Sequence, residues 1–281
     1  MHVFRYTVDL IKHLETLQGE TLGLVPTMGC LHAGHLSLVA QARAENDQVA
    51  TTIFVNPKQF NNTEDLEKYP KTLQEDLSLL EEAGCDLVFC PEPDQVYPSD
   101  FDAKVSLGGV TRALEGASRP GHFDGVTTVV SLLFNLLRPH NAYFGQKDAQ
   151  QLAVIQKMVK DLKYQVRIVG CPTARSADGL ALSSRNTRLS EPQRAEALSL
   201  YQSLCWAEQQ ILTGNRDVVQ MKEHMNQMIE EEPSTAVDYI SFADPHLLEE
   251  IDIVQGETLV SLAVFVGPVR LIDNLLISPP Q

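Results

Sequence analysis

Short apolar runs alternate with longer segments through the first 170 residues of the chain. The short runs are bounded by Gly, Pro or Asn, which is typical of strands. Apolar residues recur three and four positions apart in the longer segments, which is typical of helices. The predicted strands cover residues 21–26, 49–55, 86–90, 141–144 and 164–169. The predicted helices between them include residues 34–45, 72–83, 126–137 and 149–160.

This order of strands and helices predicts an α/β fold with a Rossmann-like, doubly wound parallel sheet and right-handed crossovers. Ligands of such sheets bind outside the carboxyl ends of the strands. The helix at residues 72–83 has the best-marked ends, because Thr72 and Glu75 match a capping box and Gly84 follows its last turn.

The pattern changes after about Thr173. Two polar helical regions, at about 191–212 and 218–229, precede strand-like runs at 237–242, 258–266 and 269–272. Helices followed by grouped strands predict a smaller α+β domain at the C-terminus. We therefore expect a first domain of residues 1–173 and a second of residues 174–281.

The composition of the 281 residues narrows the class of protein. Hydrophobic residues make up 43% and charged residues 21%, as in ordinary globular proteins. Lys and Arg number 22 against 37 Asp and Glu, and the net charge of −15 argues against nucleic acid as a partner. No apolar run is long enough to span a membrane and no secretion signal is evident, so we expect a cytoplasmic protein. The five cysteines lack CxxC spacing, which favours neither a zinc site nor disulfides.

The first segment with chemical character covers residues 25–36, which leave a predicted strand and enter a predicted helix. Gly29 and Gly34 allow a ligand to approach the backbone, and a helix start presents free N–H groups to a phosphate. His32 and His35 can point toward one place, where imidazoles would stabilise charge during phosphoryl or nucleotidyl transfer. A lone histidine would be interpreted as an ordinary turn residue or a metal ligand, but this context favours phosphate handling.

Two further strand ends carry polar side chains. Asn56 and Gln59 offer amides to a carboxylate or hydroxyl, although a structural Asn-Pro turn with an exposed Gln has the same pattern. Lys147 is placed like a phosphate-binding lysine, and Gln151 would face Gln59 across the crevice. Asp148 matches an N-cap of the next helix, and a solvated lysine at a helix start is the structural alternative.

Two loops complete the set of candidate segments. The Ser-Ser-Arg sequence at residues 183–185 lies near the expected domain boundary, where it could clamp a triphosphate from above. Residues 114–125 are polar and rich in glycine, and we expect a mobile flap there that adds Arg119 and His122 to an anionic substrate. A plain surface loop has the same composition in both places.

These segments form ordered motifs along most of the chain. The motifs are Pro26-Thr27-Met28-Gly29, His32-x-x-His35, Phe54-Val55-Asn56-Pro57 with Gln59-Phe60, Arg119-Pro120-Gly121-His122-Phe123, Gly145 with Lys147-Asp148, and Asp178-Gly179-Leu180 with Ser183-Ser184-Arg185-Asn186. Together they resemble the pantothenate synthetase, or pantoate–β-alanine ligase, family of the HxGH nucleotidyltransferase superfamily. The two histidines alone would indicate only the superfamily, whereas the ordered set is specific for the family.

The resemblance implies an ATP-dependent ligation in two steps. The carboxylate of (R)-pantoate would attack the α-phosphorus of ATP, and pyrophosphate would leave. The amine of β-alanine would then displace AMP from the pantoyl adenylate, which yields pantothenate. The resemblance also implies Mg²⁺ between the β- and γ-phosphates of ATP and a homodimeric protein.

The family pattern also assigns roles to residues of this chain. His35 would donate a proton or stabilise charge during adenylation. The implied catalytic residues are His35, His32, Lys147 and Arg185. The implied ATP contacts are Met28, Gly29, Cys30, Leu31, His32, Ala33, Gly34, His35, Gly145, Gln146, Lys147, Asp148, Ala174, Leu182, Ser183, Ser184 and Arg185. The implied substrate contacts are Gln59, Gln151, Asn56 and Arg119, and we expect no side-chain metal site.

Two alternatives to this function are considered. An adenylyltransferase of the same superfamily would act on a phosphate ester, but its acceptor site would need additional Lys or Arg where Gln59 and Gln151 offer neutral amides. A nucleotide-binding module without turnover would keep ATP binding and lack adenylation. Pantoate-dependent exchange of pyrophosphate into ATP would support the ligase. Replacing His35 with Ala separates the ligase from the module, because we expect ATP binding to survive in part while adenylation falls steeply.

Overall fold

The computed structural model describes residues 1–61 and 63–280. Its first sheet has six parallel strands in the order β1-β4-β3-β2-β5-β6. The strands are His2–Phe4 (β1), Leu22–Thr27 (β2), Gln48–Ile53 (β3), Leu87–Phe89 (β4), Asn141–Gly145 (β5) and Arg167–Cys171 (β6). The chain builds outward from β2 through β3 to β4 and then returns to β5, so the order reverses between β2 and β5. The predicted doubly wound sheet is confirmed, with its switch point at this position.

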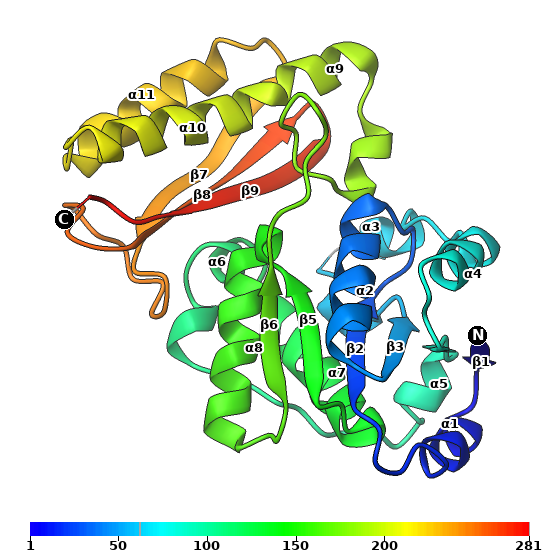
Figure 1. The fold of residues 1–281 in the computed structure, drawn as a ribbon. Helices are drawn as coiled ribbons and strands as arrows, with labels where there is room; N and C mark the ends of the chain where they lie inside the picture. The colour runs from blue at the N-terminus through cyan, green and yellow to red at the C-terminus, as the bar shows by residue number, and fades with distance from the viewer. Residues whose placement is uncertain (62, 281) are drawn as a thin grey trace.

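Helices cover both faces of this sheet (Figure 1). The longer ones are Thr7–Leu14 (α1), Ala33–Glu45 (α2), Leu73–Glu82 (α4), His122–Leu137 (α7) and Ala149–Leu162 (α8). Val25 packs with buried residues of α2 and α4, whereas its neighbour Leu24 packs with residues of α1, α7 and α8. Successive strand residues point to opposite faces, and both faces of β2 are therefore buried.

Short helices and 3₁₀ turns lie at the strand ends and loops. They are Thr63–Glu67 (α3), Pro93–Val96 (α5), Glu115–Ser118 (α6), Pro57–Gln59 (η1), Gly109–Thr111 (η2), Gln146–Asp148 (η3) and Ser184–Arg188 (η4). Two of these turns, η1 and η3, follow β3 and β5 in the chain. They place polar side chains beside the switch point.

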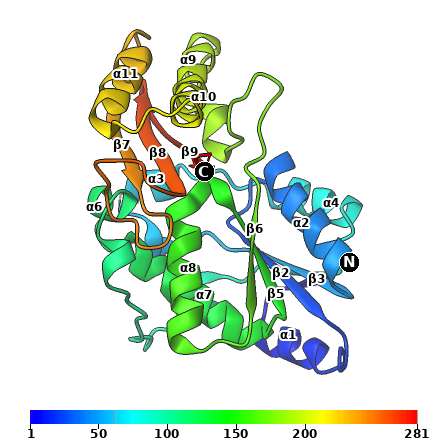
Figure 2. The ribbon, with the colours of Figure 1, turned by 60° about the vertical axis from the view of Figure 1, so that its left-hand side comes forward.

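The second half of the chain forms an antiparallel sheet in the order β7-β8-β9. Its strands are Thr235–Ala243 (β7), Thr258–Val266 (β8) and Val269–Ile277 (β9), and its helices are Glu191–Glu196 (α9), Leu198–Leu212 (α10) and Val218–Glu230 (α11). The helices α10 and α11 lie beside this sheet (Figure 2). Their buried residues pack with residues of all three strands in a core of their own. The predicted smaller α+β unit is confirmed, and the boundary at residue 173 stays a prediction.

Polar contacts join the second sheet to the first half of the chain. Arg270 on β9 makes two hydrogen bonds with the buried Glu115 of α6, at 2.8 and 2.7 Å. Asn274, also on β9, donates its side-chain N–H groups to the carbonyl oxygens of Gln146 and Lys147, at 3.0 and 2.8 Å. With these contacts, the second sheet lies beyond the carboxyl ends of β5 and β6 (Figure 1).

Several local predictions are wrong. The capping box at Thr72 does not form: the hydroxyl of Thr72 donates instead to Oδ1 of Asp76 at 3.2 Å. The helix predicted from residue 126 begins four residues earlier, at His122, and the region predicted as one helix at 191–212 is divided at Ala197. The strand β1 and the helix α1 were not predicted at all. Among the described residues, no helix has the length and apolar character needed to cross a membrane.

Candidate active site

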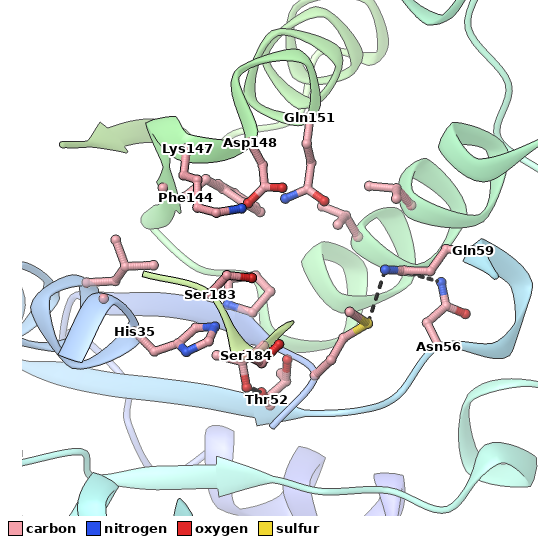
Figure 3. A pocket seen from close by; sticks show the side chains of 18 of the residues that line it. His35, Thr52, Asn56, Gln59, Phe144, Lys147, Asp148, Gln151, Ser183 and Ser184 are labelled. Atoms are coloured by element: carbon pink, nitrogen blue, oxygen red, sulfur yellow. Dashed lines mark hydrogen bonds between the residues drawn. The ribbon is translucent and has the colours of Figure 1, made fainter. Parts of the chain in front are cut away.

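A cavity of about 240 Å³ opens at the switch point, at the carboxyl ends of β2 and β5. Its walls come from the same segments that the sequence singled out, now brought together in space (Figure 3). The predicted residues that line it are Met28, His32, Gly34, His35, Asn56, Gln59, Arg119, Gly145, Lys147, Asp148, Gln151, Ala174, Leu182, Ser183, Ser184 and Arg185. The strand ends and the loop at residues 182–185 therefore form one site.

His32 and His35 lie at the first turn of α2, with ring centroids 4.2 Å apart. The backbone N–H of Gly34 donates to Nδ1 of His32 at 3.1 Å, and the backbone N–H of His32 donates to Nδ1 of His35 at 3.4 Å. Because backbone N–H groups can only donate, both Nδ1 atoms are acceptors. Each ring therefore carries its hydrogen on Nε2 when it is neutral.

The two imidazoles are neutral near pH 7. The pKa of His35 is lowered to about 3, mainly by burial. Repulsion from His32 and Lys147 adds to the lowering, and Asp148 opposes it. Burial also lowers the pKa of His32, and Lys147 adds to the effect. A neutral His35 offers the cavity an N–H donor at Nε2 without a full positive charge.

Gln59 lies at the end of η1, and its amide is oriented by neighbours. The amide N–H groups of Asn56 donate to Oε1 of Gln59 at 2.9 Å and to the carbonyl of Gly125 at 3.0 Å. Oδ1 of Asn56 accepts from the hydroxyl of Tyr97 at 2.8 Å, and Nε2 of Gln59 contacts Sδ of Met28 at 3.1 Å. Asn56 is almost fully buried and uses both ends of its amide within the protein, so its main effect is to orient Gln59.

Lys147, Asp148 and Gln151 form the opposite wall, on η3 and the first turn of α8. Gln59 and Gln151 face the cavity from its two sides, as the sequence predicted (Figure 3). The side chain of Asp148 makes no capping hydrogen bond, so the predicted N-cap role is wrong and this carboxylate borders the cavity instead.

The third wall is the loop that carries residues 182–185. The backbone N–H of Leu182 donates to the carbonyl of Ala174 at 2.9 Å, which folds the loop back on itself. Ser183 caps η4 by accepting from the N–H of Arg185 at 3.3 Å. The Arg185 guanidinium also reaches Asp65 on α3 at 3.3 Å.

The segment predicted as a flap contains helical turns at Arg119 and His122, and its mobility stays a prediction. His122 starts α7 with 7% of its surface exposed, and its Nδ1 lies 2.7 Å from the carbonyl oxygen of Gln59. Arg119 reaches the same carbonyl at 3.3 Å and Nε2 of His122 at 3.4 Å. Burial, helped by Arg119, lowers the pKa of His122 to about 4, so a neutral ring donates from Nδ1 to Gln59. Both side chains therefore hold the backbone of Gln59 in place.

Some predicted residues lie behind the cavity and some lining residues were missed. Gly29, Cys30, Leu31, Ala33 and Gln146 belong to the turns that carry lining side chains but do not border the cavity themselves. The lining residues that sequence reasoning missed include Thr52, Tyr69, Val126, Val129 and Val130. The valines could have been found, because they are the apolar face of a helix that follows the Arg119 motif. Among residues 1–61 and 63–280, no three His, Cys, Asp or Glu side chains gather as a metal site.

Comparison with known proteins agrees with this geometry. The family model described as pantoate-beta-alanine ligase matches residues 2–276. The chain is 50% identical to a pantothenate synthetase of Caldicellulosiruptor saccharolyticus, over 96% of this chain and 95% of that protein. It is 49% identical to one of Acetivibrio thermocellus, over 99% of each chain.

Two solved structures are similar over nearly the whole chain. Pantothenate synthetase of Thermus thermophilus has a TM-score of 0.94 and 42% identity, covering 99% of this chain and 100% of its own. The pantoate-beta-alanine ligase of Francisella tularensis, solved as a complex with beta-gamma ATP and beta-alanine, has a TM-score of 0.82 and 34% identity, covering 98% and 97%. This chain is therefore an enzyme that belongs to the pantoate–β-alanine ligase family.

Proposed function

We propose that this protein joins (R)-pantoate to β-alanine in two steps within the cavity at the switch point. A pantoate carboxylate oxygen attacks the α-phosphorus of ATP, the bond to the bridging oxygen breaks, and pyrophosphate leaves. The neutral amine of β-alanine then attacks the acyl carbon of the pantoyl adenylate and releases AMP with that carboxylate oxygen. A proton leaves the nitrogen, and pantothenate forms.

One observation carries this proposal: a single cavity joins two neutral amides to a set of phosphate-binding groups. Gln59 and Gln151 face each other from opposite walls, which suits an uncharged hydroxyl and a carboxylate on the acid substrate. Lys147 and Arg185 border the same cavity and would hold the phosphates as charge develops on the departing pyrophosphate. This arrangement supports a reaction in which the acid lies between the two glutamines and the nucleotide lies over α2. The acid would attack the nucleotide from that position.

His35 acts in this proposal as a charge stabiliser and not as a proton donor. Its pKa is far below neutrality, and its Nδ1 already accepts a backbone N–H, so Nε2–H is its free donor. A donor held in place before the reaction stabilises a phosphate oxygen without having to reorganise. Departing pyrophosphate needs no proton from the ring. His32, with the same tautomer, supplies the neighbouring donor.

The donor set of the cavity fits Mg²⁺ carried by the nucleotide. Mg²⁺ usually binds substrate phosphates, waters and one or two carboxylates rather than a cage made only of protein atoms. The cavity offers the Asp148 carboxylate, and the described residues hold no group of three ligands. Bound there, the ion would neutralise charge on the β- and γ-phosphates. Lys147 and Arg185 would keep the phosphates in line.

The Francisella relative supports ATP and β-alanine as substrates, because its structure was solved with beta-gamma ATP and beta-alanine. We propose further that residues 174–281 act as a lid, since the loop at residues 182–185 closes one wall and β9 contacts η3. A closed site would protect the acyl adenylate from water. The homodimer and the cytoplasmic location stay predictions.

Pantoate-dependent exchange of labelled pyrophosphate into ATP, without β-alanine, tests the first step. We expect exchange only when pantoate is present, and we expect His35→Ala to keep part of the ATP binding while exchange falls steeply. No exchange by the folded, unmodified protein would contradict the ligase. Exchange that requires a phosphate ester would favour the alternative adenylyltransferase, which the neutral amides of Gln59 and Gln151 argue against.

A further inference from the structure

The turn between β2 and α2 has an unusual backbone. Gly29 and Cys30 both have positive φ angles, +84° and +53°. Glycine adopts this region freely, but a residue with a Cβ does so at an energetic cost, and Cys30 has one. A turn of this kind persists only where neighbouring groups hold it. The two residues lie directly before Leu31 and His32, so the turn sets where α2 begins.

The group that holds this turn is the carboxylate of Asp76, on α4. Its Oδ2 accepts the backbone N–H of Cys30 at 3.0 Å, and its Oδ1 accepts that of Leu31 at 2.8 Å. Thr72 donates a third hydrogen bond at 3.2 Å. Asp76 is only 1% exposed. Successive backbone N–H groups that converge on an anion form a nest.

A nest in a phosphate-binding turn would ordinarily be open to a ligand anion. Here the side chain of α4 fills it, and Asp76 itself does not border the cavity. Oδ2 lies 3.0 Å from the position that a Cβ on Gly29 would take, so carboxylate and turn are packed directly together. The carboxylate therefore acts on the turn and, through it, on the two histidines.

We propose that Asp76 is a positioning residue for adenylation, which holds His32 and His35 in register before the nucleotide binds. The inference rests on the function proposed above, because its effect is on the adenylation step. The path is short: Asp76 fixes Leu31, the next residue is His32, and the backbone N–H of His32 orients His35. Asn56, Arg119 and His122 hold the side chain and backbone of Gln59, which meets this turn through Met28. Binding of pantoate therefore depends on Asp76 less than adenylation does.

Asp76→Asn tests this, with Glu75→Gln as the matched control. Glu75 is the exposed neighbour on the same helix, so the control removes the same charge without touching the turn. The amide keeps one acceptor and turns an N–H group toward a backbone N–H. We expect kcat for pantoate-dependent pyrophosphate exchange to fall about tenfold or more. We expect the KM for pantoate to change less than kcat, by about twofold, because Asn56, Arg119 and His122 still hold Gln59.

A second substitution separates positioning from a merely structural role. Cys30→Gly lets the turn adopt its positive φ without strain, so in the Asp76→Asn background it should restore about threefold or more of the lost kcat. A variant that had only lost stability would show a lower unfolding temperature and no such rescue. Exchange is measured well below that temperature, on protein whose folded state is checked by circular dichroism.

The outcomes are distinct. An Asp76→Asn kcat equal to that of Glu75→Gln, or a loss that Cys30→Gly does not relieve, would overturn the proposal. If Asp76→Asn does not fold, Thr72→Val carries the test, since it removes the third hydrogen bond to the carboxylate and leaves the carboxylate in place. A lowering of kcat by about two- to fivefold is expected, and an unchanged kcat overturns the inference. Absence of exchange by the unmodified protein would count against the ligase function and not against this turn.

Discussion

The side-chain amide of Asn274 donates a hydrogen bond to the carbonyl oxygen of Lys147 at 2.8 Å, from the last strand of the second sheet to the turn beside the cavity. A second bond from the same amide reaches the carbonyl of Gln146 at 3.0 Å. Asn274 is 7% exposed, so water competes little for these bonds. The position of Lys147 therefore depends on a residue 127 positions away in the chain.

Replacing Asn274 by Asp should displace Lys147 and slow adenylation. The new carboxylate has the same shape but turns an acceptor toward two carbonyl oxygens. We expect kcat for pyrophosphate exchange to fall about tenfold or more, with the KM for pantoate changed less. Asn135→Asp is the control, since Asn135 is exposed near the end of α7. Equal rates for the two variants would show that the contact does not position Lys147.

The close approach of α7 to η1 gives a second prediction. A Cβ on Gly125 would lie 2.3 Å from the carbonyl oxygen of Lys58 and 2.7 Å from the backbone nitrogen of Gln59. Gly125→Ala must therefore push η1 away from α7, and Gln59 moves with it. We expect the KM for pantoate to rise about tenfold. Gly256→Ala, where a Cβ meets nothing within 4 Å, should leave that KM unchanged; a normal KM in Gly125→Ala would contradict this picture of the acid site.

His122 should make stability depend on pH below neutrality. Its folded-state pKa is lowered to about 4, mainly by burial, whereas histidine in an unfolded chain titrates near about 6.5. Between about pH 6.5 and about pH 4, the unfolded chain binds this proton and the folded chain does not. The stabilising contribution of His122 is therefore full above about pH 6.5 and is lost as the pH falls toward 4. At pH 5 the loss from this residue is about 2 kcal/mol.

Urea unfolding of His122→Gln at about pH 7.5 and about pH 5 checks this. The variant should lose less free energy of unfolding between the two pH values than the unmodified protein, because its side chain does not titrate. His246→Gln removes an exposed histidine and should leave the pH dependence as it was. Parallel curves for His122→Gln and the unmodified protein would mean that His122 is not buried as a neutral ring.

The elements of the fold were predictable where the spacing of apolar residues along the chain reflects which side chains are buried. Strand β2 and helix α8 have patterns strong enough to be located within two residues. The strand β1 was missed because it has only 3 residues, too few for a pattern to stand out. Thr72 and Glu75 match a capping box in sequence, but the hydroxyl of Thr72 bonds to Asp76. Asp76 is held in turn by the backbone N–H of Leu31, 45 positions away, and a local pattern cannot reveal that contact.

The sequence predicted which residues belong to the site better than it predicted their hydrogen bonds. The residue types of His35, Lys147, Gln59 and Gln151 indicate what they can bind, and all four border one cavity. What Arg119 does could not be foreseen, because its partner is the backbone of a residue 60 positions away. Composition indicated a mobile, polar flap, but in the structure this segment contains α6 and the first turn of α7, and His122 contacts η1.

If pantoate attacks the α-phosphorus of ATP in this cavity, one of its carboxylate oxygens must pass to AMP. Pantoate labelled with ¹⁸O in its carboxylate, allowed to react with ATP and β-alanine for a single turnover, tests it most directly. We expect one labelled oxygen in AMP and none in pyrophosphate, by mass spectrometry of both products. Label in inorganic phosphate, with ADP as the nucleotide product, or unlabelled AMP would contradict it.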